Sequence, residues 1–369
     1  MTVAAIMPRP SVAAPRRVRT RPPMRQIVTP VLAAAIAAVA FVDLLFAWFL
    51  PLSGSFGFWM CSYIAFLAFY AALVSLTTGA RETVRDRLAT VVLASAGVLM
   101  VAVVVLVVGF TAVRGWGAVR HVGFFVHTTA RTGPQDPLTS GGILAAVVGT
   151  LEQVLFAGAV SVPLALGTAL YLSETDGRGR RSVRIVVETM TAIPSILAGL
   201  FIFAVVVLTL GFHRSGFGAA LALSVEMLPV VARAADVVLR LVPQGLREAS
   251  YALGASRWET VRRVVLPTAR PGLVTAVLLG VARVVGETAP VLLVAGFTSE
   301  LNGNPFSGPQ VSLPLFVFNY VKYPVNNAIT RAFGAAFALV LIVLVLFVAA
   351  RILGNRGVGS RRFLRGRTS

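Results

Sequence analysis

The chain has 369 residues, of which 57% are hydrophobic and only 13% are charged. Soluble globular proteins carry about 25% charged residues, so this composition excludes an ordinary soluble domain. The formal net charge is +19 at pH 7, but the arginines lie mainly in the two tails and in short segments between apolar stretches. That distribution is typical of membrane topology and not of nucleic-acid binding. Cys61 is the only cysteine, which excludes a disulfide framework and a cysteine metal site.

The apolar stretches predict an all-α membrane protein. Several exceed the ~20 residues that a helix needs to cross a hydrocarbon core of about 30 Å. A backbone in lipid must satisfy its own hydrogen bonds, so these stretches are expected to be helical. About eight spanning helices are predicted, at 29–50, 57–78, 88–112, 141–172, 185–210, 217–239, 272–296 and 332–353.

The basic residues predict the orientation of these helices. Residues 1–28 form an arginine-rich tail without the short apolar core of a cleaved signal peptide, and 356–369 form a second basic tail. The segments predicted to lie inside hold 24 of the 33 lysines and arginines, and those outside hold six. Both termini are therefore expected in the cytoplasm. The outer segments 113–140 and 297–331 either face an external partner or are plain connecting loops.

Three prolines lie inside predicted spans: Pro163, Pro194 and Pro229. Proline removes a helical hydrogen bond and bends the helix, which frees backbone groups. These bends suit a gate beside a central cavity, but prolines in membrane helices also serve packing alone. Both interpretations stay open.

The longest inner loop, 240–271, is predicted to be a rigid helix-turn-helix. A first short helix covers residues 243–253, and Gly254 stands where a helix ends in the left-handed conformation. Ser256 and Glu259 form an S-x-x-E capping box that starts a second helix. Pro267 is expected to interrupt this second helix.

The same loop reads REASYALGASRWETVRRVVLP and resembles the EAA loop of ABC importer permeases. Glu248, Ala249 and Gly254 match that pattern, Leu266–Pro267 closes it, and Ser250 replaces the usual second alanine. The resemblance implies that the first short helix is a coupling helix, seated in a groove of a separate ATPase subunit. The residues expected to serve this contact are Arg247, Glu248, Ala249, Ser250, Ala252, Gly254, Ala255 and Pro267.

The nucleotide site is expected on a partner subunit. A Walker A motif requires Gly-Lys-Ser/Thr, and the sole lysine, Lys322, follows Val321. The chain is therefore not expected to be an enzyme, and ATP-Mg is assigned to the partner ATPase. No cofactor or metal is expected in the chain, because the three histidines show no ligand spacing.

The segment GVARVVGETAPVLLVAG, from Gly280 to Gly296, is similar to phosphate-importer permeases of the PstA type. Further matching segments are GGILAAVVGTL at 141, AIPSILAGL at 192, MLPVVAR at 227 and NPFSGPQVSLPLF at 304. The resemblance covers about 85–355 and implies a type I ABC importer permease (MetI-like) core. The helix pair at 29–78 is then an addition to the core, and Asp43 within it has no assigned role.

A phosphate path is predicted from charges at membrane depth, which usually face a partner or a water-filled path. Arg283 and Glu287 are four residues apart on one helix face and can pair. Arg283 and Arg233 are expected to present forked donors to phosphate, while Glu287 orients Arg283 and Thr288 adds a hydroxyl. A plain packing ion pair is the alternative for Arg283 and Glu287.

Other charged residues in the predicted spans are harder to assign. Arg233 can instead extend its side chain to the membrane interface or pair with Asp236. Glu152 and Glu226 occupy apolar segments where uncharged residues are expected. Either carboxylate can meet Arg283 across helices, which the sequence does not establish.

The resemblance implies a multi-pass subunit of the bacterial cytoplasmic membrane, embedded in the lipid bilayer. Its expected partners are a related permease of the PstC type, two ATPase subunits of the PstB type and an external phosphate-binding protein of the PstS type. Alternatives are the PstC-type subunit itself or a permease for sulfate, molybdate or another solute. An intramembrane enzyme is disfavoured, because neither HExxH nor G-x-S-x-G is present. An ion-driven transporter would not explain the EAA loop.

Overall fold

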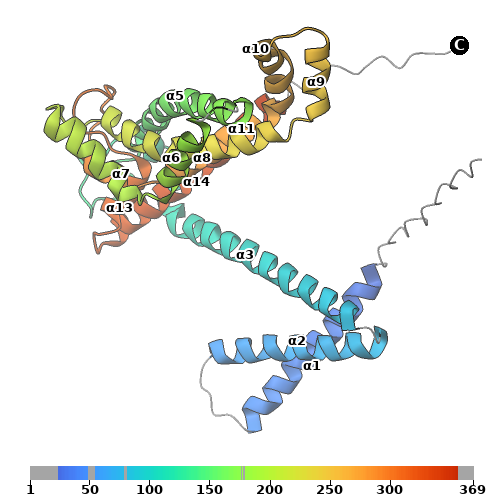
Figure 1. The fold of residues 1–369 in the computed structure, drawn as a ribbon. Helices are drawn as coiled ribbons and strands as arrows, with labels where there is room; N and C mark the ends of the chain where they lie inside the picture. The colour runs from blue at the N-terminus through green and yellow to red at the C-terminus, as the bar shows by residue number, and fades with distance from the viewer. Residues whose placement is uncertain (1–23, 49–54, 79–80, 176, 178, 356–369) are drawn as a thin grey trace, which may run out of the picture. The chain divides into compact units, whose positions relative to one another are not determined.

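A computed structural model describes residues 24–48, 55–78, 81–175, 177 and 179–355. Across these residues every regular element is a helix (Figure 1), so the predicted all-α class is confirmed. The chain divides into two compact units, Met1–Val104 and Val105–Ser369. The boundary falls inside α3 (Arg81–Val119).

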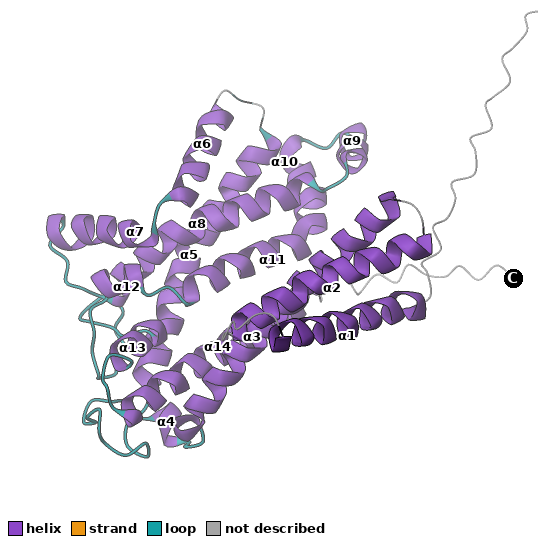
Figure 2. Ribbon diagram, turned by 90° about the horizontal axis from the view of Figure 1, so that it is seen from below, coloured by secondary structure: helices purple, strands orange, loops and turns teal. Residues whose placement is uncertain are grey.

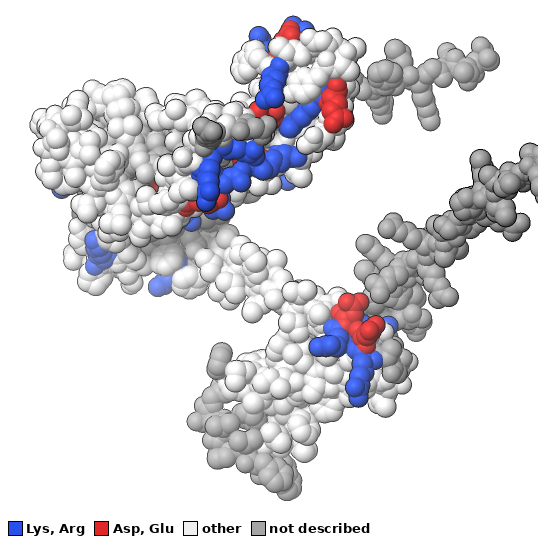
Figure 3. Space-filling model, viewed as in Figure 1, with Lys and Arg blue, Asp and Glu red and all other residues white. Residues whose placement is uncertain are grey.

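The first unit contains α1 (Met24–Trp48), α2 (Ser55–Thr78) and the beginning of α3. α1 and α2 pack together around Ala34, Tyr70 and Val74, which are almost fully buried. Charged side chains of this unit gather at the beginning of α3 (Figure 3), where Glu82 complements the helix dipole. Asp43 is exposed on α1. Most of the remaining surface is apolar, as expected for helices that face lipid.

The second unit contains the remaining helices (Figures 1 and 2). They are α4 (Gly123–Val126), α5 (Leu144–Glu174), α6 (Gly179–Ala192), α7 (Ser195–Ile202), the π-helix η1 (Phe203–Thr209), α8 (Gly216–Arg240), α9 (Gln244–Ala252), α10 (Arg257–Thr260), the π-helix η2 (Val261–Val265), α11 (Leu266–Val285), α12 (Ala289–Val294), α13 (Leu313–Tyr320) and α14 (Asn326–Asn355). α8 lies at the centre and packs against α5 on one side and α11 on another.

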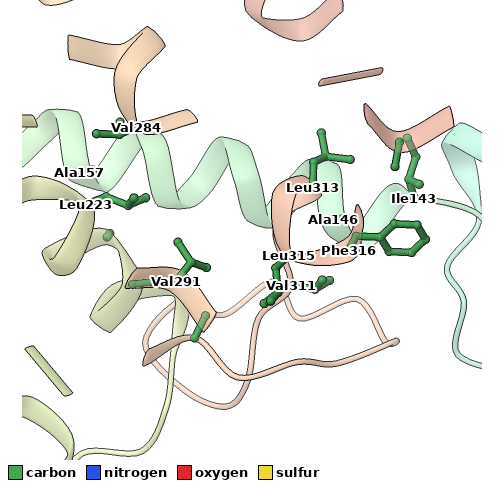
Figure 4. Packing of buried hydrophobic residues seen from close by; sticks show 14 of the residues in the cluster. Ile143, Ala146, Ala157, Leu223, Val284, Val291, Val311, Leu313, Leu315 and Phe316 are labelled. Carbon is green, nitrogen blue, oxygen red and sulfur yellow. The ribbon is translucent and has the colours of Figure 1, made fainter. Parts of the chain in front are cut away.

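Small residues let these central helices approach closely. Ala157 of α5 and Ala219 and Ala220 of α8 are almost fully buried, and the Ser224 hydroxyl donates to the carbonyl oxygen of Ala157. Figure 4 shows Val284 of α11 beside this contact. Close backbone approach replaces the hydrophobic effect as the source of helix association in a bilayer, where lipid tails are as apolar as the side chains.

Within the described residues, five helices are long and apolar enough to cross a membrane, or six if α6, α7 and η1 are taken as one bent span. The five are Gly57–Thr77, Arg81–Val119, Leu144–Glu174, Arg257–Val285 and Asn326–Ile352. α1 and α8 are not among them. The multi-span architecture is therefore confirmed, and the count of eight stays a prediction.

The predicted span at 185–210 is not one straight helix. α6 and the segment beginning with α7 meet at an angle of 104°, and Pro194 occupies the break as the N-cap of α7 with an extended ψ of 138°. Proline disfavours helical geometry at the preceding residue, here Ile193, and α6 ends just before it at Ala192. Pro163 and Pro229, in contrast, lie inside the continuous helices α5 and α8.

Two boundaries around α11 also differ from the prediction. Pro267 does not interrupt its helix, because the wider π turn of η2 precedes it and α10, η2 and α11 form one span. A π turn displaces the carbonyl group that would clash with the proline ring in α-helical geometry. At the other end, the predicted helix 272–296 breaks after Val285, and α12 begins only at Ala289.

The end of the second unit opposite the EAA loop is closed by an inserted loop. The loop before α13 packs between α5 and α8, where Gln310 and Val311 are almost fully buried. The Leu313 amide donates to the Thr150 hydroxyl at 2.7 Å. Gly149 of α5 makes room for this loop, because a β-carbon there would overlap the carbonyl oxygen of Val311.

Substitution of Gly149 tests this insertion. Gly149→Ala is expected to lower the stability by about 1–3 kcal/mol through overpacking, seen as a lower melting temperature of the purified protein. Gly158→Ala, in the same helix, is the matched control because nothing lies within 4 Å of the added β-carbon. The control should keep the melting temperature or raise it slightly, since alanine favours a helix over glycine by about 1 kcal/mol. Equal effects of the two changes would contradict the insertion.

A second loop at this end is held by a buried arginine. Arg331 of α14 is fully buried and donates to the carbonyl oxygens of Gly133, Asp136, Pro137 and Ser140 at 2.8–3.3 Å. A guanidinium group carries five donors and no acceptor, so it can hold several carbonyl groups of one loop together. Arg331, which the sequence placed only in a loop, therefore has a structural role.

Candidate functional site: the EAA loop and a charged cavity

The EAA loop has the predicted helix-turn-helix geometry. α9 ends before Gly254, whose φ of +83° lies in the left-handed region. Ser256 and Glu259 form the complete capping box at the start of α10. The hydroxyl groups of Ser250 and Thr260 lie 2.8 Å apart and join the two helices. Together these contacts fix the angle between α9 and α10.

Arg247, one of the residues expected to serve the ATPase contact, turns toward the central helices. Its guanidinium group pairs with Glu174 at the end of α5 at 3.0 Å and donates to the carbonyl oxygen of Leu239 in α8 at 3.0 Å. The side chains of Arg247 and Glu174 are only 16% and 17% exposed. The arginine therefore anchors the inner face of α9 to the two central helices.

The opposite face of α9 is open. Glu248, Ala249 and Ala252 are exposed, and Leu253 after the helix is 89% exposed. On this face of the molecule, charged side chains gather over α9, α10 and the neighbouring helices (Figure 3). A short helix with a small, alanine-rich outer face and a rigidly anchored inner face is suited to insertion in a groove of a partner.

The remaining predicted coupling residues lie elsewhere. Ala255 is half-buried in the turn after Gly254. Pro267 is exposed on α11, where it lines an apolar cavity of about 510 Å³ with residues of α5, α11 and α14. Ser250 is turned toward Thr260. Of the predicted set, the open face of α9 is thus formed by Glu248, Ala249 and Ala252.

The anchor of α9 can be tested by local hydrogen exchange. Arg247→Ala leaves the half-buried Glu174 without its cation. We expect the free energy of local unfolding of α9 to fall by about 1–2 kcal/mol, because the pair is partly exposed. This corresponds to roughly 5–30-fold faster exchange of the amides in α9. Arg263→Ala is the matched control, since Arg263 pairs with Glu259 while 77% exposed. Unchanged exchange in Arg247→Ala would show that the pair does not hold α9.

A charged cavity of about 470 Å³ lies where α6, α8 and α11 meet. Its lining residues are Met190, Thr191, Ile193, Glu226, Pro229, Val230, Leu279, Ala282 and Arg283. The cavity thus contains one cation and one carboxyl group among mainly apolar side chains.

The predicted pair of Arg283 and Glu287 is present but loose. The Nε atom of Arg283 lies 3.7 Å from a carboxylate oxygen of Glu287, and the arginine side chain is 60% exposed. Glu287 and Thr288 lie in the break between α11 and α12, with Thr288 as the N-cap of α12. Because 3.7 Å exceeds hydrogen-bond distance, this pair leaves the donors of Arg283 able to meet an anion.

Arg233 lies near the cavity without lining it. It donates to the hydroxyl of Thr191, a lining residue, at 3.3 Å. Its predicted alternative pairing with Asp236 is wrong: Asp236 pairs with Arg240 at 2.9 Å and with Arg184 at 4.0 Å.

Glu226 and Glu152, the two glutamates in apolar segments, lie in different surroundings. Glu226 lines the cavity together with Arg283 and interacts electrostatically with Arg283 and Glu287, but it forms no ion pair with Arg283. Glu152 instead accepts a hydrogen bond from Gln310, which also accepts one from Gln153 at 3.2 Å. Glu152 of α5 therefore contacts the inserted loop before α13. The only sequence signal that separated these carboxylates from ordinary residues was a charge in an apolar helix.

A family model described as "Binding-protein-dependent transport system inner membrane component" matches residues 161–356, a range that contains both the EAA loop and every residue lining the charged cavity. The chain belongs to this family of inner membrane components. Members are permease proteins of transport systems, so the two features described above are those of a membrane permease.

Several relatives of this family are similar over most of their length. The chain is 41% identical over 283 residues, 76% of the chain and 92% of the relative, to phosphate transport system permease protein PstA 1 of Mycobacterium tuberculosis (strain CDC 1551 / Oshkosh). It is 38% identical to phosphate transport system permease protein PstA of Mycobacterium leprae (strain TN) over 289 residues, 77% of the chain and 94% of the relative.

Among solved structures, the inward-facing MetNI methionine ABC transporter contains a chain with a TM-score of 0.47 and 23% identity. The similarity covers 59% of this permease chain and 94% of the other.

Proposed function

We propose that the chain is the PstA-type membrane-spanning subunit of an ATP-driven phosphate importer. The observation that carries the assignment is the 41% identity with a phosphate permease over 92% of that protein's length. The charged cavity supports it, because a tetrahedral oxyanion needs forked donors and Arg283 carries them into a space of about 470 Å³.

In the proposed complex the permease forms half of the translocation path, and a related PstC-type subunit forms the other half. A phosphate-binding protein delivers the anion from outside. Two PstB-type ATPase subunits bind ATP-Mg and receive the open face of α9. Closure of the ATPases moves α9, and the anchor of Arg247 on Glu174 passes that movement to α5. Both termini lie in the cytoplasm in this arrangement.

The cargo and the subunit type have alternatives. The chain could serve as the PstC-type subunit, or the complex could carry another oxyanion. The relatives named above are all PstA proteins of phosphate transport systems, which favours the first assignment.

Reconstitution tests the proposal. The permease, its PstC-type partner, the ATPases and the binding protein are placed in liposomes, and uptake of radiolabelled phosphate is measured with and without ATP. ATP-dependent uptake that excess unlabelled phosphate suppresses, and excess sulfate or molybdate does not, is the expected result. Liposomes that lack only this chain are the control. Uptake of a labelled anion that excess phosphate leaves unchanged would overturn the substrate assignment.

A further inference from the structure

Glu226 is a buried carboxyl group that the permease mechanism leaves unused. It lies in the middle of α8 with a side chain that is 9% exposed. Both of its oxygen atoms are buried, and neither accepts a hydrogen bond from an N–H or hydroxyl group among the described residues. The Glu287 carboxyl group lies close enough to share a hydrogen bond with Glu226. Buried polar groups in native proteins are nearly always paired, so a buried carboxyl group whose neighbour is a second carboxyl group needs an explanation.

The surroundings of Glu226 place it beside the anion donors. Glu226 and Arg283 line the same cavity, and Arg283 and Glu287 are the charged groups that act on Glu226 electrostatically. Glu287 already faces Arg283 at 3.7 Å. The cavity lining therefore includes the forked donors of Arg283 and the carboxyl group of Glu226.

This combination is unsuitable for an anion that has only acceptors. A carboxylate accepts hydrogen bonds and cannot donate them, so it repels a fully deprotonated oxyanion such as sulfate. Phosphate differs, because its mono- and dianion carry at least one hydrogen on oxygen near neutral pH. That hydroxyl can donate to Glu226 while the remaining oxygens accept from Arg283. A site built around a ligand's hydroxyl rejects an analogue without it, because buried groups would be left unpaired.

We propose that Glu226 accepts a hydrogen bond from the hydroxyl of the transported oxyanion, and that this contact makes the cavity select hydrogen-bearing phosphate over sulfate. The inference rests on the proposed phosphate-importer function and adds a specificity residue to it. Selection at this point acts inside the membrane, independently of the external binding protein.

The test uses the purified complex of both permeases and both ATPases, without the binding protein. Melting temperatures are measured in titrations with inorganic phosphate, arsenate and sulfate at constant ionic strength, and affinities follow from the stabilisation. Arg283→Ala serves as the blank: only the part of the melting-temperature shift that this variant loses is assigned to the cavity. The subtraction excludes any shift caused by anions that bind to the ATPases.

The wild-type complex is expected to bind phosphate and arsenate at least tenfold more tightly than sulfate. Glu226→Gln should reduce this preference at least tenfold, because an amide offers a donor to sulfate. Glu226→Asp should keep the preference with weaker affinity, which guards against a folding defect in one variant. Asp43→Asn, the same chemical change in α1, should leave the preference unchanged.

Equal Arg283-dependent affinities for phosphate and sulfate in the wild type would overturn the inference, and so would the absence of any Arg283-dependent binding. An unchanged preference for phosphate over sulfate in Glu226→Gln would also overturn it. That result is expected if Glu226 is neutral and donates its own proton to the anion, as the glutamine amide would. Phosphate uptake by the wild-type importer, measured separately, tests the proposed function. If phosphate uptake proceeds but the preference for phosphate over sulfate is absent, the proposed function stands and only the role of Glu226 is wrong.

Discussion

Glu248→Arg is expected to reduce ATP-driven phosphate uptake at least tenfold and to release the ATPase from the purified complex. Glu248 is exposed on the open face of α9, and in the proposed complex this face enters the ATPase groove. Reversal of a charge inside an interface places like charges together and costs several kcal/mol. The change also spares the internal contacts, because Arg247 and Ser250 hold the inner face of the same helix.

The measurement combines uptake by reconstituted liposomes with co-purification of the ATPase. Glu82→Arg is the control, because Glu82 is an exposed glutamate at the beginning of α3 and lies outside the EAA loop. The control variant should keep both uptake and the ATPase. Normal uptake by Glu248→Arg with the ATPase still bound would contradict the coupling role of α9.

Arg283→Ala is expected to abolish most phosphate uptake while the ATPase remains bound. Among the residues that the structure describes, Arg283 is the only basic one that lines the cavity, whereas Arg233 reaches it indirectly through Thr191. Hydrogen bonds to a charged group contribute about 1.5–3 kcal/mol each. Loss of the donors should therefore lower the uptake rate by about tenfold to a hundredfold. Arg283→Lys should restore little, because an ammonium group lacks the planar fork.

Arg214→Ala is the matched control for this arginine. Arg214 is exposed near the end of the loop before α8 and lies over the ring of Phe203 at 5.3 Å, outside the cavity. Its variant is expected to transport phosphate at the wild-type rate. If Arg283→Ala transported equally well, Arg283 would be a packing residue, which is the alternative that its pairing with Glu287 leaves open.

In the EAA loop, features that depend on a few consecutive residues could be predicted from the sequence, and contacts with distant residues could not. The left-handed Gly254 and the Ser256–Glu259 capping box were both predicted and are present, because each depends on a few consecutive residues. The inward contact of Arg247 was not predicted, for the complementary reason. Its partner, Glu174, lies 73 positions away in the chain at the end of another helix, and no local pattern indicates which way a charged side chain on a surface helix will turn.

The charged cavity shows a similar division. Arg283 and Glu287 were found from their spacing on one helix face, although the helix ends between them and their contact is loose. Glu226 was recognised only as a charge in an apolar segment. Its position beside Arg283 depends on how α8 packs against α11, and its separation from Glu152 depends on the loop that brings Gln310 to α5.

The sequence by itself determined the class of protein, the family and the geometry of the EAA loop. Hydropathy, capping signals and the family motifs act over short distances along the chain, so they can be read without a fold. Only the tertiary structure decided the break at Pro194, the continuous helix through Pro267, the inward anchor of Arg247 and the burial of the Glu226 carboxyl group. These features depend on which helices pack together, because a bend or a buried charge is stabilised by groups that lie far away in the sequence.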